Sequence, residues 1–223
     1  MADQHRRLDD DLDQLRDKVL LLGGEAETAV RKAMAALVER DSDLARDVLI
    51  HDDIIDQLEL DIDELTIDIL ALFTPTARDL RFVMTAAKLG PTLERIADHA
   101  CNIARRAIEL NDEPQLKPYI DLPAMGNLAA DMLRAGMDAF AAEEAKGAQE
   151  IIGRDERIDA LYNQLFRELL TYMIENPRCI SQGAGLLFVA KHLERIADYV
   201  TNICEQIVYM VEGRVIKHMP FES

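Results

Sequence analysis

One pattern of residues occurs twice in this chain. The stretch LERIADHACNI covers residues 93–103, and LERIADYVTNI covers residues 193–203, in a chain of 223 residues. A repeat at about half the chain length is typical of two related structural units in tandem. The sequence therefore predicts two halves of similar structure, divided into residues 1–112 and 113–223.

Apolar residues recur at helical spacing in both halves. In the first predicted helix, Leu8, Leu12, Leu15 and Val19 follow one another at steps of three and four. This spacing is typical of an amphipathic helix. The same periodicity predicts helices over residues 7–39, 42–73 and 80–110 in the first half, and 120–147, 150–175 and 180–211 in the second.

Turn residues divide these predicted helices. Asp41-Ser42 offers an N-cap for the second helix. Thr74-Pro75 and Asn176-Pro177 each end a helix, because the residue before a proline disfavours the helical conformation. No segment alternates between apolar and polar residues as a strand does. The fold class predicted is all-α, with two tandem three-helix bundles and six main helices.

Composition limits the compartment and the partners. The 42 acidic and 25 basic residues give a formal net charge of −17, which repels nucleic acid and favours cations or basic partners. No stretch approaches the ~18 apolar residues of a membrane-spanning helix, and the start lacks an apolar signal core. We expect a cytoplasmic protein without a transmembrane segment. The cysteines lack C-x-x-C spacing and are interpreted as buried thiols: Cys101, Cys179 and Cys204.

Acidic residues at a spacing of four occur in two predicted helices of each half. They are Asp52, Asp56, Glu94 and Asp98 in the first half, and Asp155, Asp159, Glu194 and Asp198 in the second. Residues four apart lie on one face of a helix, so each pair forms an acidic stripe. A single stripe of this kind is what any solvated helix face shows.

The stripes are placed symmetrically about the proline turns. In the first half the outer pair, Asp52 and Asp98, and the inner pair, Asp56 and Glu94, are both centred on the proline of the turn. In an antiparallel hairpin, residues equidistant from the turn lie at one level. The acidic residues of the second half keep this symmetry about their own turn. Each half is therefore predicted to gather four carboxylates at one level.

Four like charges at one level repel one another, so something is expected to offset them. A bound cation is the first candidate, because carboxylate oxygens suit hard ions such as Mg²⁺, Ca²⁺, Mn²⁺ or iron. Asn102 and Asn202 are candidate extra or supporting ligands. The competing explanation is neutralisation by neighbouring arginines, namely Arg95, Arg105 and Arg195.

Two other functions remain open. A carboxylate-bridged metal enzyme is disfavoured, because such sites normally carry E-x-x-H motifs on facing helices and this spacing is absent. His99 and His192 lie beside acidic stripe residues and are interpreted as structural or surface residues. A metal-free helical scaffold that uses its acidic stripes to bind a basic partner is the third interpretation.

The doubled motif also carries a family resemblance. L-E-R-I-x-D-x-x-x-N-I, with TARDLR after the first proline turn and VYMVEG after the second copy, resembles the PhoU family of accessory regulators of bacterial phosphate-specific transport. The similarity extends from Leu8 to Gly213. Ala97 and Ala197 stand where the family usually has glycine, and this departure leaves the acidic positions intact.

The resemblance implies a fold, a cofactor and partners. It implies two three-helix bundles related by pseudo-twofold symmetry, acidic motifs that bind metal clusters, usually iron or zinc, and a homodimer. It also implies coupling between the ATPase of the phosphate ABC importer and a sensor histidine kinase, which holds the phosphate-starvation response off. We therefore expect a non-enzymatic regulatory adaptor in the cytoplasm, which reaches the inner membrane face through its partners.

Overall fold

The structure is a computed structural model that describes residues 2–216, and for residues 2–5 the backbone alone. No β-strand occurs in residues 2–216. The helices are α1 (Ala2–Val38), α2 (Ser42–Leu72), α3 (Ala77–Asn111), α4 (Asp121–Ala141), α5 (Ala145–Ile152), α6 (Asp155–Glu175) and α7 (Ile180–Glu212), with a 3₁₀ turn at Pro177–Cys179.

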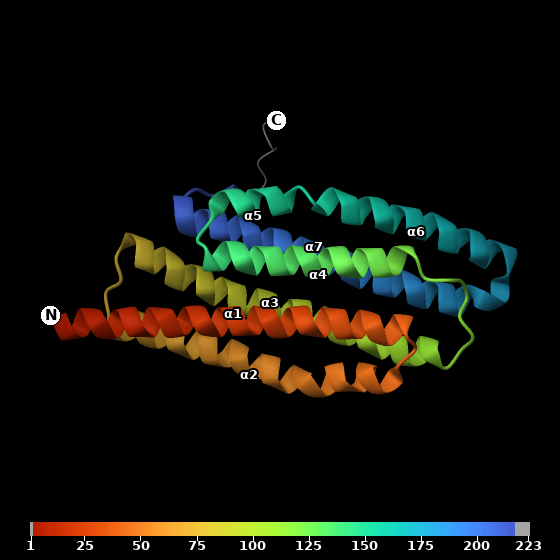
Figure 1. Cartoon of the computed structure of the whole chain (residues 1–223), viewed down its shortest axis with the longest axis horizontal. Helices are drawn as coiled ribbons and strands as arrows, with labels where there is room; N and C mark the ends of the chain where they lie inside the picture. The colour runs from red at the N-terminus through yellow and green to blue at the C-terminus, as the bar shows by residue number, and fades with distance from the viewer. Residues whose placement is uncertain (1, 217–223) are drawn as a thin grey trace.

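The helices form two bundles that lie side by side along one long axis (Figure 1). In the first bundle α1, α2 and α3 contact one another, and in the second α7 contacts α4, α5 and α6. The pair α5 and α6 runs along one outer edge of the molecule as α2 runs along the other (Figure 1). The predicted fold class is confirmed, with α5 and α6 together taking the place of one main helix.

The second half departs from the predicted helix bounds. The helix expected over 120–147 ends at Ala141, and the one expected over 150–175 is divided into α5 and α6. Glu143 has a φ of 50°, in the left-handed region that a residue other than glycine seldom adopts, so the helix cannot continue. Arg40, with a φ of 59°, ends the first helix of the first half in the same way. Gly153 and Arg154 form the turn between α5 and α6.

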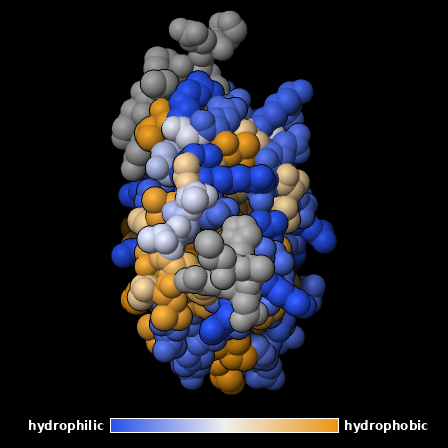
Figure 2. All heavy atoms as spheres, turned by 90° about the vertical axis from the view of Figure 1, so that its left-hand side faces the viewer, coloured by the Kyte–Doolittle hydropathy of each residue, from blue (hydrophilic) through white to orange (hydrophobic). Residues whose placement is uncertain are grey.

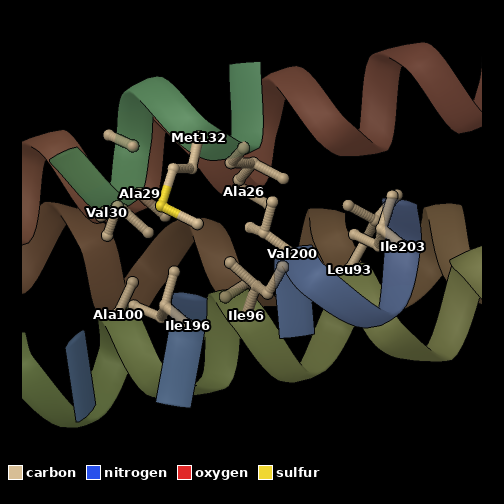
Figure 3. Packing of buried hydrophobic residues seen from close by; sticks show 14 of the residues in the cluster. Ala26, Ala29, Val30, Leu93, Ile96, Ala100, Met132, Ile196, Val200 and Ile203 are labelled. Carbon is tan, nitrogen blue, oxygen red and sulfur yellow. The ribbon is translucent and has the colours of Figure 1, made fainter. Parts of the chain in front are cut away.

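The hydrophobic core runs through both halves without interruption. Helix α3 packs against α7 and α1 packs against α4, so the two bundles bury their inner faces against each other. Figure 3 shows side chains of α1, α3, α4 and α7 meeting at this junction, among them Ala29, Ile96, Met132 and Ile196. All four are at most 8% exposed. The division into two domains at residue 112, in the loop before α4, stays a prediction.

The described helices are too polar to lie across a bilayer. None of them contains a stretch that is both long and apolar enough to cross a membrane.

Candidate metal centres

The first group of acidic residues lies along the α2–α3 hairpin. Asp52 and Asp56 are on α2, and Glu94 and Asp98 are on α3. Asp52 and Glu94 are half-buried, whereas Asp56 and Asp98 are exposed. The two helices are in contact, and the extended residues around Pro75 reverse the chain between them. The proline turn thus forms where it was predicted.

Charges of this group act on one another across the hairpin. Partial burial raises the pKa of Asp56, and the charges of Asp52 and Asp98 raise it further. The pKa of Glu94 is raised by burial first and then by Asp98 and Asp56. Glu59, which sequence reasoning did not select, also has a raised pKa, because of burial and then the charges of its acidic neighbours. The hairpin therefore brings Asp56, Glu94 and Asp98 within electrostatic reach of one another.

The second group lies along the α6–α7 hairpin and is more deeply set. Asp155 is the first residue of α6, and Asp159 lies one turn later. Burial raises the pKa of Asp155 to about 6, with further contributions from Asp159, Asp198 and Glu194. The Oδ1 atom of Asp155 is buried without a hydrogen-bond partner. All four predicted carboxylates of this half thus interact through their charges.

Basic side chains compete with a cation for the carboxylates of the second group. The Nζ atom of Lys191 contacts the carboxylate of Glu194. Arg195 Nη1 lies 3.3 Å from Asp198 Oδ2. Burial and Glu194 raise the pKa of Asp198, while Arg195 and Lys191 lower it. Arg195 was predicted as a competitor for the carboxylates, whereas Lys191, one turn before Glu194, was missed.

The two candidate asparagines differ in their surroundings. Asn102 is half-buried, and its Oδ1 accepts a hydrogen bond of 3.0 Å from Arg105 Nη1. Asn202 is exposed. Arg105 thus contacts the amide rather than the carboxylates. Among the described residues, Arg95 forms no ion pair.

The carboxylates fit an oxygen-coordinated cation by their chemistry. Asp155 Oδ1 offers an unpaired buried oxygen. The pKa values of its group are raised by burial first and then by mutual repulsion, and a bound cation would offset both effects. In the orientations that the described side chains adopt, no three of His, Cys, Asp or Glu are grouped so as to hold a metal ion. The assignment of the eight carboxylates and two asparagines as ligands stays a prediction.

A histidine pair at the junction of the halves was not foreseen. His99 Nδ1 on α3 and His192 Nδ1 on α7 are 2.8 Å apart, and the ring of Tyr199 lies 5.6 Å from that of His99. Burial lowers the pKa of both imidazoles, that of His192 to about 4. The pair is therefore a neutral contact between α3 and α7, in line with the structural role predicted for these residues.

The three cysteines are free and buried, as expected. Cys101 lies next to the first acidic group, and its thiol donates to the backbone oxygen of Val48 at 3.9 Å. Burial and then the charge of Asp52 raise the pKa of this thiol to about 12. Without a bound cation, Cys101 is therefore a protonated thiol at neutral pH.

Comparison with known proteins places the chain among relatives of similar length. The PhoU domain matches it twice, over residues 19–107 and 122–207. A protein of Aquifex aeolicus described as "Phosphate-specific transport system accessory protein PhoU homolog" is 40% identical over 208 residues, which cover 93% of this chain and 94% of that protein. A second homolog, from Thermotoga maritima, is 37% identical over 213 residues, which cover 96% of this chain and 91% of that protein.

Solved structures agree with these matches. The crystal structure of PhoU from Pseudomonas aeruginosa superposes with a TM-score of 0.89 at 38% identity, over 92% of this chain and 99% of that one. The phosphate transport system regulatory protein PhoU from Streptococcus pneumoniae superposes with a TM-score of 0.87 at 32% identity, over 94% and 99%. The chain belongs to the PhoU family, a family of accessory proteins of phosphate-specific transport.

Proposed function

We propose that this protein is a metal-binding adaptor that couples the phosphate ABC importer to a sensor histidine kinase and holds the phosphate-starvation response off. The observation that carries this proposal is the pair of mutually repelling carboxylate groups, one in each repeat of a PhoU chain. The ATPase of the importer and the kinase are the proposed partners. The adaptor acts without catalysis, in the cytoplasm, as a homodimer.

The carboxylates have a defined part in this function. The first group would hold a cation through Asp52, Asp56, Glu94 and Asp98, and the second through Asp155, Asp159, Glu194 and Asp198. Such an ion supplies positive charge to an otherwise repulsive surface. The protein's own contribution is to hold α2 against α3 and α6 against α7, so that carboxylates of both helices of each hairpin interact through their charges. Iron or zinc is proposed for the site, with Mg²⁺, Mn²⁺ and Ca²⁺ as candidates from the all-oxygen donor set.

A metal-free scaffold is the second candidate function. The contacts of Lys191 with Glu194 and of Arg195 with Asp198 favour it, because basic side chains then offset the acidic stripe without an ion. A basic segment of a partner would bind the same stripes through charge complementarity. The two candidates differ in whether partner binding needs metal.

Capture of the partners tests the adaptor. The protein is immobilised in metal-loaded and chelated forms and exposed to the importer ATPase and to the kinase, at high and at low phosphate. The Glu194→Gln/Asp198→Asn variant is compared with Asp9→Asn/Asp13→Asn, a control pair at the same spacing on the exposed face of α1. We expect the metal-loaded protein to capture both partners at high phosphate. Capture should be lost in the chelated form and in Glu194→Gln/Asp198→Asn, but not in the control pair. Capture of neither partner under any condition contradicts the adaptor, and equal capture by the chelated form favours the scaffold.

A further inference from the structure

A small cavity lies where the α4–α5 turn meets the first bundle. Its volume is about 170 Å³, and its lining includes Arg16, Arg78, Asp79, Phe82 and Glu143. These residues come from α1, from the start of α3 and from the turn after α4, so both halves contribute to the cavity. It belongs to the end of the molecule that Figure 2 faces, where hydrophilic and hydrophobic side chains lie next to one another.

Two guanidinium groups converge on a single carboxylate in this cavity. Arg16 Nη2 donates to Glu143 Oε1 at 2.8 Å, and Arg78 Nη2 donates to Glu143 Oε2 at 2.5 Å. Each carboxylate oxygen thus has its own arginine. The guanidinium of Arg16 also lies over the ring of Phe82, 5.1 Å from its centroid, which restricts its position.

One donor of Arg16 is not satisfied by Glu143. The Nε atom of Arg16 is buried and has no hydrogen-bond partner. Buried polar atoms without a partner are rare in proteins and call for an explanation. The backbone at Glu143 is also in the left-handed region, which is unfavourable for a residue with a side chain. The ion pairs of Glu143 therefore leave both an unpaired donor and a strained turn.

A pair of guanidinium groups is a common protein ligand for a phosphate-type oxyanion. Arginine presents several N–H donors in a planar fork, and two such forks match the oxygens of a tetrahedral anion better than the two oxygens of a carboxylate. The side chain of Asp79 also lines the cavity, and its negative charge opposes an incoming anion. Binding is therefore expected to be weak, with a dissociation constant on the order of millimolar.

We propose that Arg16 and Arg78 form a binding site for inorganic phosphate, which Glu143 occupies in the absence of the anion. The choice of phosphate among oxyanions rests on the proposed function. Because Glu143 belongs to the second half and both arginines to the first, anion binding releases two ion pairs between the halves. The contacts of the α4–α5 turn with the first half thereby depend on the phosphate concentration.

Phosphate titration of the chelated protein tests this site. Binding is measured by calorimetry and by the NMR signals of the arginine Nε–H groups, with inorganic phosphate and, in parallel, sulfate. Glu143→Gln is expected to bind phosphate about tenfold more tightly than the wild type, because the competing charge is gone. Arg78→Gln, at a largely exposed side chain, is expected to abolish binding without unfolding the protein. Arg31→Gln is the control, because Arg31 of α1 also pairs across the halves, with Asp131 of α4, and is expected to bind as the wild type.

Three outcomes overturn the site. They are no binding by either the wild type or Glu143→Gln, equal binding by Arg78→Gln and the wild type, and tighter binding of sulfate than of phosphate. Chelation keeps metal-bridged phosphate out of the measurement, so partner capture remains a separate test. No phosphate binding together with intact partner capture overturns this site alone, whereas phosphate binding without capture overturns the adaptor and leaves the site standing.

Discussion

The carboxylates of Glu143 and Asp155 lie in opposite electrostatic surroundings. Hydrogen bonds from Arg78 and the charges of both arginines hold the pKa of Glu143 below its usual range. Burial and three other acidic residues raise the pKa of Asp155 to about 6. The charge of Glu143 therefore stabilises the fold, whereas the charge of Asp155 opposes it until a cation binds.

The ion pairs of Glu143 should make the stability of the protein depend on pH in the acid range. The folded pKa of Glu143 is lowered, so its contribution is complete above the unfolded value, near 4.5, and is lost as the pH falls through the folded value. Glu143→Gln should therefore be less stable than the wild type at pH 7, and the difference should shrink as the pH falls below 4.5. Urea unfolding between pH 7 and 3 measures this, with Glu144→Gln, at the exposed neighbouring residue, as the control. Parallel curves for the wild type and Glu143→Gln would count against the ion pairs.

The effect of Asp155 on stability should depend on pH in the opposite direction. The folded pKa of Asp155 is raised from 3.8 to about 6, so the chelated protein loses stability as the pH rises from about 4 to 6. Asp155→Asn should be more stable than the chelated wild type at pH 7, and the advantage should vanish near pH 4. Added metal should stabilise the wild type more than the variant, which keeps an intact carboxylate group only in its first half. Glu156→Gln, at the exposed next residue, serves as the control in thermal melts, and a destabilised Asp155→Asn at pH 7 contradicts the account.

At the scale of helices, α1 and α4 pack through a reciprocal pair of glycines. A Cβ atom at Gly23 would lie 2.7 Å from Met137 Cγ, and one at Gly126 would lie 2.6 Å from Met34 Cγ. Each helix thus accepts a methionine of the other at a position without a side chain. This exchange allows the close approach of the two bundles along α1 and α4.

Alanine substitutions separate packing from helix propensity at this crossing. Gly23→Ala and Gly126→Ala should each lower the free energy of unfolding by about 1–3 kcal/mol, because the methionine must move out of a filled core. Gly24→Ala should raise it by about 0.5–1 kcal/mol, since a Cβ there meets no atom within 4 Å and alanine favours the helix. Urea unfolding compares the three. Equal effects at Gly23 and Gly24 would contradict the reciprocal packing.

The helices themselves were largely predictable, and the break after α4 was not. Periodic apolar residues located the long helices, and Asp41 caps α2 as predicted, with Oδ1 accepting from the backbone of Asp43 at 3.0 Å and Leu44 at 2.9 Å. The residues at the break, Glu143 and Glu144, are ordinary helix formers by propensity. Glu143 leaves the helical conformation while pairing with arginines distant in sequence, and propensity contains no information on such contacts.

At the scale of the whole molecule, the two bundles share one core. Ile196 of α7 is fully buried and lies near Ile96 of α3 at the junction of the halves (Figure 3). The sequence repeat predicted two similar bundles, but how they pack depends on surfaces that helical periodicity does not identify. For this reason the His99–His192 contact across α3 and α7 was missed. The two hairpins that carry the carboxylates were predictable from their proline turns, whereas the shared level of the four carboxylates in each stays a prediction.

The shared core should make unfolding cooperative across both halves. Ile196→Ala should lower the free energy of unfolding by about 2–5 kcal/mol, because it leaves a cavity in a filled region. The loss should be equal when unfolding is followed by probes placed in the first and in the second half. Hydrogen exchange of the two halves measures it. Destabilisation confined to the second half would show that the bundles unfold independently.

Metal content tests the central claim, that each repeat binds metal ions through its carboxylates. Untagged protein purified without chelator is analysed by mass spectrometry for metal per chain, together with Glu94→Gln/Asp98→Asn, Glu194→Gln/Asp198→Asn and the control Asp9→Asn/Asp13→Asn. We predict stoichiometric metal in the wild type and the control, a loss of the metal of one half in each carboxylate variant, and retention of the metal in the other half. Wild-type protein without stoichiometric metal, or equal metal in all four proteins, would contradict the claim.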